Sequence, residues 1–384
     1  MPALDAAQRA QSEAMLASLR ARIAARGGWI PFDEYLEQLL YAPGLGYYSA
    51  GAAKIGAAGD FTTAPELSGL FGACIARQCA PLLRGGGDLL ELGAGSGALA
   101  EVLLTRLAAL EALPDHYAIL ETSADLRERQ QQRLARLPPA LHARLRWLDR
   151  LPASGLGGVI LANEVADALP FQCFAVRAEG YTERGVALDA LGGLCWAERP
   201  ASVALGSELA RLSAALPQPL SPGYRSELCL RLGPWIGSLA ATLRWGWLLL
   251  FDYGLGQAEL YHPQRTSGTL RCHYRQRAHD DPFLHPGLQD VTAWVDFTRL
   301  AGAAIDAGLA LEGYCTQAAF LLGAGIDAEL ESARSALERA QLASEARQLL
   351  MPEEMGEVFK AMALSRGAPD PPDAFRIQDL RRSL

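Results

Sequence analysis

Three glycines at alternate positions and two carboxylates form the first pattern in this chain that could do chemistry. The glycine loop, Gly93–Gly97, follows an apolar run and leads directly into an Ala- and Leu-rich segment. Glycine allows the backbone to approach a ligand closely, and the start of a helix offers unpaired N–H groups to ligand oxygens. Glu121 ends the next apolar run, at a suitable distance to accept hydrogen bonds from both hydroxyls of a ribose. Together these residues indicate a site for a nucleoside cofactor.

The residue two places before the first glycine helps to choose the cofactor. The pattern Gly93-x-Gly95-x-x-Ala98 also satisfies the relaxed fingerprint of NAD-binding loops. An acid at the position of Glu91 is typical of S-adenosylmethionine (SAM) loops, where it lies near the cationic methionine portion, whereas NAD loops usually have an apolar residue there. An ordinary glycine turn with both acids in solvent is the alternative, but strand, glycines, helix and second acid all agree. We therefore predict SAM, bound by Glu91, Gly93, Ala94, Gly95, Gly97 and Glu121.

Two further polar segments could take part. Asn163, Glu164 and Asp167 follow the fourth predicted strand, and the carboxyl ends of parallel strands line the ligand crevice of an open sheet. The residues alone equally allow a helix that begins at Asn163 with Glu164 in its first turn. The segment Gly59–Glu66 carries one carboxylate and two hydroxyls, on Asp60, Thr62 and Thr63. From the residues alone, a helix entrance capped by one of these threonines, with Pro65 in the first turn, is favoured there.

Strands that alternate with helices must position these side chains. Such alternation predicts an α/β fold with a parallel sheet. We also assign Asp149, the last residue of the third predicted strand, to the cofactor site. The predicted core strands are Asp88–Leu92, Tyr117–Glu121, Leu145–Asp149, Gly158–Asn163, Trp247–Asp252, Leu309–Thr316 and Val358–Leu364.

The remaining segments suggest additions to this core. We predict helices over residues 5–26 and 31–40, and we assign residues 1–70 to an N-terminal helical extension that includes a shaped loop. Residues 71–384 then form the main domain. It is interrupted by a β-rich insertion at about 171–225, with short strands such as Phe171–Val176, and by a polar loop at about 253–290. A helix is expected near Glu227–Leu243.

Composition narrows the class of protein. The formal net charge of −8 argues against a nucleic-acid partner, and no apolar run reaches the length of a membrane span. The seven cysteines are scattered and form no C-x-x-C pair, which favours reduced thiols in the cytoplasm over disulfides or zinc. Four histidines crowd residues 262–285 without the spacing of a metal site, so we predict no metal; the arginines of that loop could bind an acidic partner. The oligomeric state stays open, with a homodimer as one option.

Long segments in one order also resemble a known family. The chain is similar to the MidA-like methyltransferases, which include the mitochondrial protein-arginine methyltransferase that assists assembly of respiratory complex I. The resemblance covers nearly the whole chain, although Trp294 and Gln276 stand where the family often has histidine. It rests on Leu40–Tyr48, Gly59–Ser68, Glu91–Gly97, Asn163–Pro170, Asp252–Gly254, Gly268–Leu270, Asp290–Ala293 and Met355–Lys360.

This resemblance implies a class I (Rossmann-like) SAM-dependent methyltransferase fold with an N-terminal helical extension and a β-rich insertion. It makes Gly59–Glu66 and Asn163–Pro170 active-site elements. Asp60, Thr62, Thr63 and Asn163 then join the cofactor site, and Asn163, Glu164 and Asp167 become the catalytic candidates.

The methyl acceptor is the least determined feature. The resemblance implies an arginine in a protein substrate, and carboxylates such as Glu164 and Asp167 could then hold its guanidinium bidentately. The alternative acceptor is a small-molecule hydroxyl or amine. Base methylation is disfavoured, since Asn163–Ala166 lacks the prolines and the aromatic residue that usually follow such an asparagine. From other classes, an NAD-dependent oxidoreductase and a non-catalytic assembly factor remain as alternatives.

Overall fold

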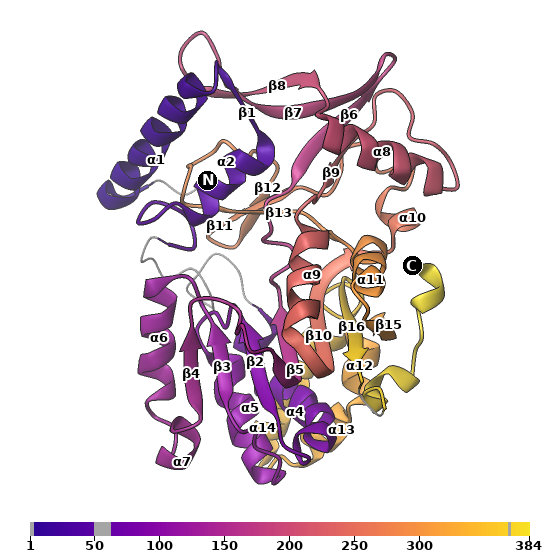
Figure 1. The fold of residues 1–384 in the computed structure, drawn as a ribbon. Coiled ribbons are helices and arrows are strands. Elements are labelled where there is room, and N and C mark those ends of the chain that lie inside the picture. Colours follow the sequence, from indigo (N-terminus) through magenta and orange to yellow (C-terminus); the bar gives the residue numbers. More distant parts are fainter. Residues whose placement is uncertain (1–3, 50–62, 368–369) are drawn as a thin grey trace.

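The computed structural model describes residues 4–49, 63–367 and 370–384. Figure 1 shows a lower part built on one large sheet and an upper part that carries α1, α2, β1, β6–β9 and β11–β13. Among the described residues, no helix is both long and apolar enough to cross a bilayer, and no group of three or more His, Cys, Asp or Glu side chains could hold a metal ion.

The large sheet contains every core strand that the sequence predicts. β16 runs antiparallel to both of its neighbours, and the pairings among β10, β5, β2, β3 and β4 are parallel. A short strand, β14 (Val295–Asp296), extends the end of β10. Numbered along the chain, the seven core strands lie in the order 3-2-1-4-5-7-6, the α/β arrangement expected for a class I methyltransferase. Across the sheet they are β4 (Leu145–Leu148), β3 (Tyr117–Leu120), β2 (Asp88–Leu92), β5 (Leu156–Asn163), β10 (Leu243–Leu255), β16 (Phe359–Arg366) and β15 (Ala310–Thr316).

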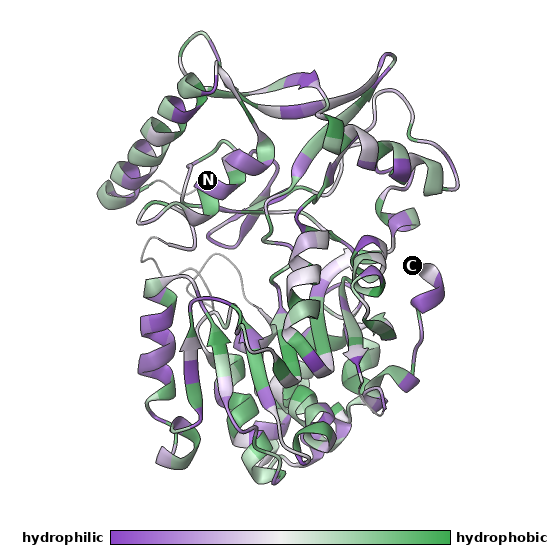
Figure 2. Ribbon diagram, viewed as in Figure 1, coloured by the Kyte–Doolittle hydropathy of each residue, from purple (hydrophilic) through white to green (hydrophobic). Residues whose placement is uncertain are grey.

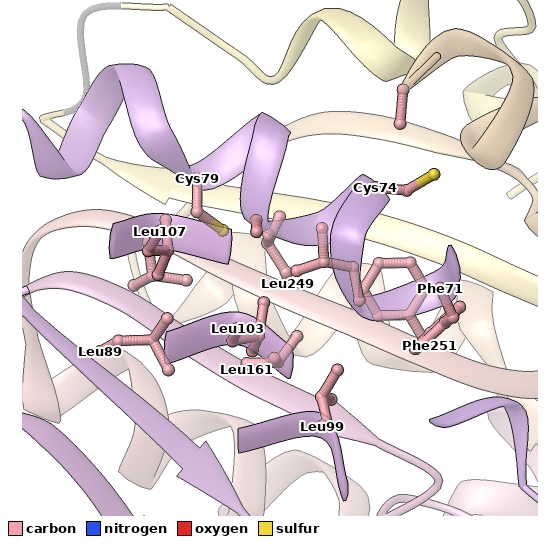
Figure 3. Packing of buried hydrophobic residues seen from close by; sticks show 14 of the residues in the cluster. Phe71, Cys74, Cys79, Leu89, Leu99, Leu103, Leu107, Leu161, Leu249 and Phe251 are labelled. Atoms are coloured by element: carbon pink, nitrogen blue, oxygen red, sulfur yellow. The ribbon is translucent and has the colours of Figure 1, made fainter. Parts of the chain in front are cut away.

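Alternating side chains of these strands supply two separate cores. Leu89, Leu161 and Leu249 point to one face, and their sequence neighbours Leu90, Ile160 and Leu250 point to the other. Figure 3 shows the first core, where Phe71 and Leu103 meet Phe251 and the strand leucines. Figure 2 shows these strands as mostly hydrophobic and the outer surface of α6 as hydrophilic. Burial on both faces explains why the central strands are almost continuously apolar.

Helices cover the two faces of the sheet. On the first face lie α4 (Gly69–Leu83), α5 (Ala98–Ala109), α6 (Ala124–Leu134), α7 (Pro139–His142), α12 (Gln317–Gly323), α13 (Ile326–Glu331) and α14 (Ala336–Leu350). On the second lie α9 (Leu232–Thr242) and α11 (Phe297–Asp306). The result is a three-layer sandwich in which the carboxyl ends of the parallel strands face the upper part (Figure 1).

The upper part joins segments that are far apart in the sequence. The N-terminal segment forms α1 (Ala6–Ala25), α2 (Phe32–Tyr41) and a strand that the sequence did not reveal, β1 (Trp29–Pro31). β1 pairs with β7 of the inserted region, so the extension and the insertion share one sheet. That sheet contains β6 (Gln172–Arg177), β7 (Gly180–Leu188), β8 (Leu194–Pro200) and β9 (Arg225–Leu228), with α1 and α2 on one face and α8 (Val203–Ala215) on the other.

Two local expectations differ from the structure. The helix expected near Glu227–Leu243 begins only at Leu232, because Arg225–Leu228 pairs with β6. The segment 253–290 is not a loop throughout. It contains α10 (Gln257–Leu260) and a three-stranded sheet of β11 (Arg271–Tyr274), β12 (Arg277–His279) and β13 (Asp290–Thr292). The β11–β12 turn was hidden because Arg275 and Gln276, rather than Gly or Asn, take its two positive φ angles.

Candidate active site

The ends of three parallel strands meet at one cavity. Gly93 follows β2, Glu121 follows β3, and Glu164 follows β5, all at the carboxyl edge of the sheet. The cavity has a volume of about 390 Å³, within the usual range for a ligand site. Two tyrosines of the N-terminal extension, Tyr41 and Tyr48, also line it. The cavity is therefore walled by the main sheet and by the upper part together.

The glycine loop has the backbone that the sequence predicts. Gly93, Gly95 and Gly97 have φ angles of +58°, +54° and +84°, a region that other residues rarely adopt. Gly93, Ala94, Gly95 and Ser96 line the cavity. Gly97 is instead the N-terminal cap of α5, and a Cβ on it would lie 3.5 Å from the Cα of Gln130. Its role in the structure is to form the turn and to let α6 approach.

Glu91 lies beneath this loop. Glu91 is only 3% exposed, and its carboxylate accepts a hydrogen bond of 2.5 Å from the Tyr117 hydroxyl. Burial raises the pKa of Glu91 to about 7, against the opposing effect of that hydrogen bond. A cation bound in the cavity would favour the ionised carboxylate.

Glu121 is held by a network that the sequence did not indicate. Its carboxylate accepts hydrogen bonds of 2.9 Å from the Ser123 N–H and from the Gln130 side chain. Gln130 also donates to the Gly95 carbonyl at 3.0 Å and accepts from the Trp147 indole at 3.1 Å. Burial raises the pKa of Glu121, although these donors oppose the effect. Each carboxylate oxygen keeps further lone pairs for a ligand hydroxyl.

The Asn163–Pro170 segment forms a turn rather than a helix. Glu164 has a φ of +53°, and the Asn163 amide donates to its carboxylate at 3.1 Å. Both residues line the cavity. Burial, and to a smaller extent the charge of the neighbouring Asp167, raise the pKa of Glu164 to about 8. Left-handed backbone in a residue other than glycine is typical of functional sites, because the strain must be compensated by surrounding contacts.

Asp167 belongs to the same turn as Glu164 but does not line the cavity. The Tyr253 hydroxyl donates to its Oδ2, while its Oδ1 is buried without a hydrogen-bond partner among the described residues. The backbone N–H groups of Ala166 and Asp167 donate to Asp252 at 3.0 and 3.2 Å, which fixes the turn. Burial raises the pKa of Asp167 to about 6.

The predicted threonine segment is described only from Thr63 onward, so Asp60 and Thr62 lie outside the described residues. Thr63 lines the cavity at the start of α3 (Ala64–Leu67), where its side chain makes no cap hydrogen bond. Glu66 of α3 accepts a hydrogen bond from Ser96 of the glycine loop. The first turn of α3 therefore lies against the glycine loop.

Asp149 is another predicted site residue that does not line the cavity. Its side chain is 86% exposed and pairs with Arg127 at 2.6 Å, and it is absent from the residues that line the cavity. The turn after β4 directs this carboxylate toward solvent, while Leu151 of the same turn does line the cavity.

Comparison with known proteins decides between the cofactor classes. A family described as S-adenosyl-L-methionine-dependent methyltransferase matches residues 74–315. The chain belongs to this methyltransferase family. A crystal structure of a protein from Burkholderia thailandensis bound to S-adenosyl-homocysteine has a TM-score of 0.94 and 44% identity, and each chain is covered completely.

Curated relatives support the same family over most of the chain. The protein arginine methyltransferase NDUFAF7 of Danio rerio, named as mitochondrial, is 29% identical and covers 91% of this chain and 86% of its own. The NDUFAF7 of Mus musculus is also 29% identical, with 94% of this chain and 86% of its own covered. This methyltransferase is therefore an enzyme that uses SAM, which confirms the cofactor predicted from the glycine loop and the fold predicted from the strand–helix alternation and the family resemblance.

Proposed function

We propose that this methyltransferase transfers the methyl group of SAM to a guanidinium nitrogen of arginine in a partner protein. The names of the curated relatives support this acceptor. The single observation that carries the proposal is the buried carboxylate of Glu164 in the wall of the cavity beside the glycine loop. Because the pKa of Glu164 is raised to about 8, a bound cation would favour its ionised form, so this carboxyl group suits a cationic acceptor better than a neutral hydroxyl.

The residues of the cavity fit the donor. Glu121 would accept hydrogen bonds from the ribose hydroxyls, and the loop from Gly93 to Ser96 would contact the methionine portion. Glu91 would offset the positive charge of that portion from beneath the loop. When bound, SAM supplies an activated methyl group whose bond to sulfur breaks with both electrons going to the sulfur. The protein must then align the acceptor and exclude water, which can supply about 7–11 kcal/mol of the barrier reduction.

The acceptor side must overcome the poor nucleophilicity of arginine. A guanidinium has a pKa above about 12, and its lone pairs are delocalised. Hydrogen bonds from two of its nitrogens to the two carboxylate oxygens of Glu164 would localise positive charge on that side of the group, and the buried Asp167 nearby would add negative charge. The remaining nitrogen would then become the better nucleophile.

A proton must leave as the new carbon–nitrogen bond forms. The substrate begins as a cation and the methylated product is again a cation, so one proton is released for each methyl group transferred. Glu164 is placed to accept it, because burial raises its pKa to about 8, close to the value that suits a base near neutral pH. The Ala64 N–H, which hydrogen-bonds to Glu164, would help to hold the ionised form.

Replacement of Glu164 tests this role. Glu164→Gln should lower methyl transfer by at least about a hundredfold while SAM still binds, because the general base and the negative charge are lost and the shape is retained. Glu353→Gln, an exposed carboxylate, is the matched control. Transfer is measured with radiolabelled SAM and arginine-containing peptides, followed by mass spectrometry of the methylated residue. Unchanged transfer in Glu164→Gln, or methyl groups only on other residue types, would contradict the proposal.

We propose separately that the protein is located in the cytoplasm. Scattered cysteines favour the cytoplasm, whereas the curated relatives are named as mitochondrial. Imaging of the tagged protein in its own cell, against cytoplasmic markers, tests this proposal.

A further inference from the structure

A second cavity lies in the upper part of the molecule. It has a volume of about 340 Å³ and shares no lining residue with the cavity beside the glycine loop. Its walls are rich in arginine and tryptophan, and we call it the arginine cavity. They include Arg184, Arg225, Arg265, Arg271, Trp196 and Trp294, together with the carboxylates Glu227 and Asp280.

The sheet register explains why these charges gather. Arg184 of β7 and Glu227 of β9 both pair with Cys173 of β6, so their side chains lie in one row on the same face. Arg225 lies two residues before Glu227 and therefore points to that face as well. The opposite face of the sheet carries residues such as Phe174 of β6 and is covered by α8. The arginines thus occupy a face that the hydrophobic core does not fill completely.

The loop of residues 267–271, which lines this cavity, is held in place by hydrogen bonds within the protein. The N–H and hydroxyl of Thr269 donate to Glu227 at 2.8 and 3.2 Å, and the Thr269 hydroxyl oxygen accepts from the Trp294 N–H at 3.0 Å. Gly268 has a φ of +76°, and a Cβ on it would collide with the Glu227 carboxylate. Such a prebuilt wall lowers the entropy cost of binding.

The arginines exceed the carboxylates available to them. Glu227 is engaged by the Thr269 donors, and Arg271 pairs with Asp280. No carboxylate of the described residues lies within ion-pairing distance of Arg225 or Arg265. The Nε of Arg265 is buried without an acceptor there, and its guanidinium lies 5.1 Å from the centre of the Trp294 ring.

The positive charges of Arg184 and Arg225 also repel each other. The side chain of Arg184 is 15% exposed, and its one ion-pair partner among the described residues is Glu198, at 3.8 Å, which it shares with Arg177; its guanidinium also lies 4.2 Å from the centre of the Trp196 ring. Burial lowers the pKa of Arg184, and the charge of Arg225 lowers it further. A bound anion would relieve both effects. The protein has a formal net charge of −8, whereas the arginines that line this cavity outnumber its carboxylates.

The chemistry favours carboxylates over phosphate. Arginine forks match both carboxylates and phosphates bidentately, but no described lining residue belongs to a helix N-terminus of the kind that often binds phosphate. A small third cavity shares Trp294 and Glu227 with the arginine cavity, shares Leu169 with the donor cavity, and is also lined by Asp167. The residues around this third cavity, whose volume is about 30 Å³, therefore place the arginine cavity close to the acceptor side of the donor cavity.

We propose that the arginine cavity binds the carboxylates of an acidic segment in the protein substrate. The statement that this segment belongs to the methyl acceptor rests on the proposed function. The binding of an acidic peptide to the arginine cavity is independent of that function. This interaction would select substrates that carry acidic residues near the methylated arginine, and it would weaken with rising salt.

Binding of a fluorescein-labelled glutamate hexapeptide, followed by fluorescence anisotropy at low salt, tests the site. The double variant Arg225→Gln/Arg265→Gln should bind the peptide about tenfold more weakly or worse, because it removes the two arginines without carboxylate partners. The control Arg136→Gln/Arg347→Gln removes the same charge from exposed positions on the lower part and should bind as the unaltered protein does. SAM affinity should be unchanged in both variants, which checks that they are folded.

Equal loss in the control, or no binding of the peptide by the unaltered protein, would overturn the proposal. Tighter binding of inorganic phosphate than of the peptide, measured by competition, would also overturn it, since the ligand would then be a phosphate. The peptide contains no arginine and the readout needs no methyl transfer. Failure of the proposed arginine methylation would therefore leave this result interpretable by itself.

Discussion

Glu91 shows how a single buried carboxylate can couple donor binding to pH. Burial raises its pKa to about 7 from an ordinary value of 4.5. Its neutral form is therefore favoured in the free protein below about pH 7. The resulting stability is fully present below the unfolded-state pKa and is lost as the pH rises through about 7, by about 3 kcal/mol in total. A bound cation reverses this preference, because it attracts the ionised carboxylate.

We therefore expect SAM affinity to increase between about pH 6 and pH 8, with a proton released from Glu91 on binding. Titration calorimetry across this range, in buffers of different ionisation enthalpy, measures both quantities. Glu91→Gln should bind SAM more weakly and with a flatter pH profile. Glu164→Gln is the informative control, because it removes another carboxyl group with a raised pKa from the cavity wall and should keep the slope below pH 7. A profile that is equally steep in Glu91→Gln would show that another group titrates.

At the scale of single elements, α6 matters more than its polar sequence suggests. Gln130 is fully buried on the inner side of this helix and joins Glu121, Gly95 and Trp147 in one hydrogen-bond network. The helix thereby fixes the end of β3 relative to the glycine loop. A glutamine among other glutamines carries no sequence signal for such a role, since the role depends on how α6 packs over the edge of the sheet.

Gln130→Ala should weaken SAM binding by about tenfold, because Glu121 and the Gly95 carbonyl lose a donor and both become free to move. In steady-state kinetics the KM for SAM should rise while kcat changes little. Gln132→Ala lies on the exposed side of the same helix and controls for lost helix stability. An equal effect of both substitutions would refute the positioning role of Gln130.

The elements differ in how far the sequence could predict them. The sequence predicts Glu121 and Glu164 because each follows an apolar strand, and parallel strands end at one edge of the sheet. Asp149 follows the same rule, yet its side chain turns outward to Arg127, and a strand end does not determine the direction of the next side chain. The hairpin of β11 and β12 was missed because its turn lacks the usual glycine or asparagine.

At the scale of the whole molecule, the upper part depends on pairings that one sequence cannot reveal. β1 of the N-terminal extension pairs with Gly185–Ala187 of the insertion, and Tyr41 and Tyr48 of the extension reach the cavity at the strand ends. Figure 1 shows this part above the carboxyl edge of the large sheet. The donor cavity therefore exists only when both parts are folded together. SAM should accordingly stabilise the entire molecule, by an amount that grows with ligand concentration.

Titration calorimetry of the purified protein with SAM tests the central claim most directly, with Glu121→Ala measured in parallel. One donor should bind per chain with an affinity in the micromolar range, and Glu121→Ala should weaken it by at least about tenfold, because the ribose hydroxyls lose their acceptor. Thermal unfolding of both proteins confirms that each is folded. Absence of binding by the folded protein, or equal binding by Glu121→Ala, would contradict the assignment of the donor site to this cavity.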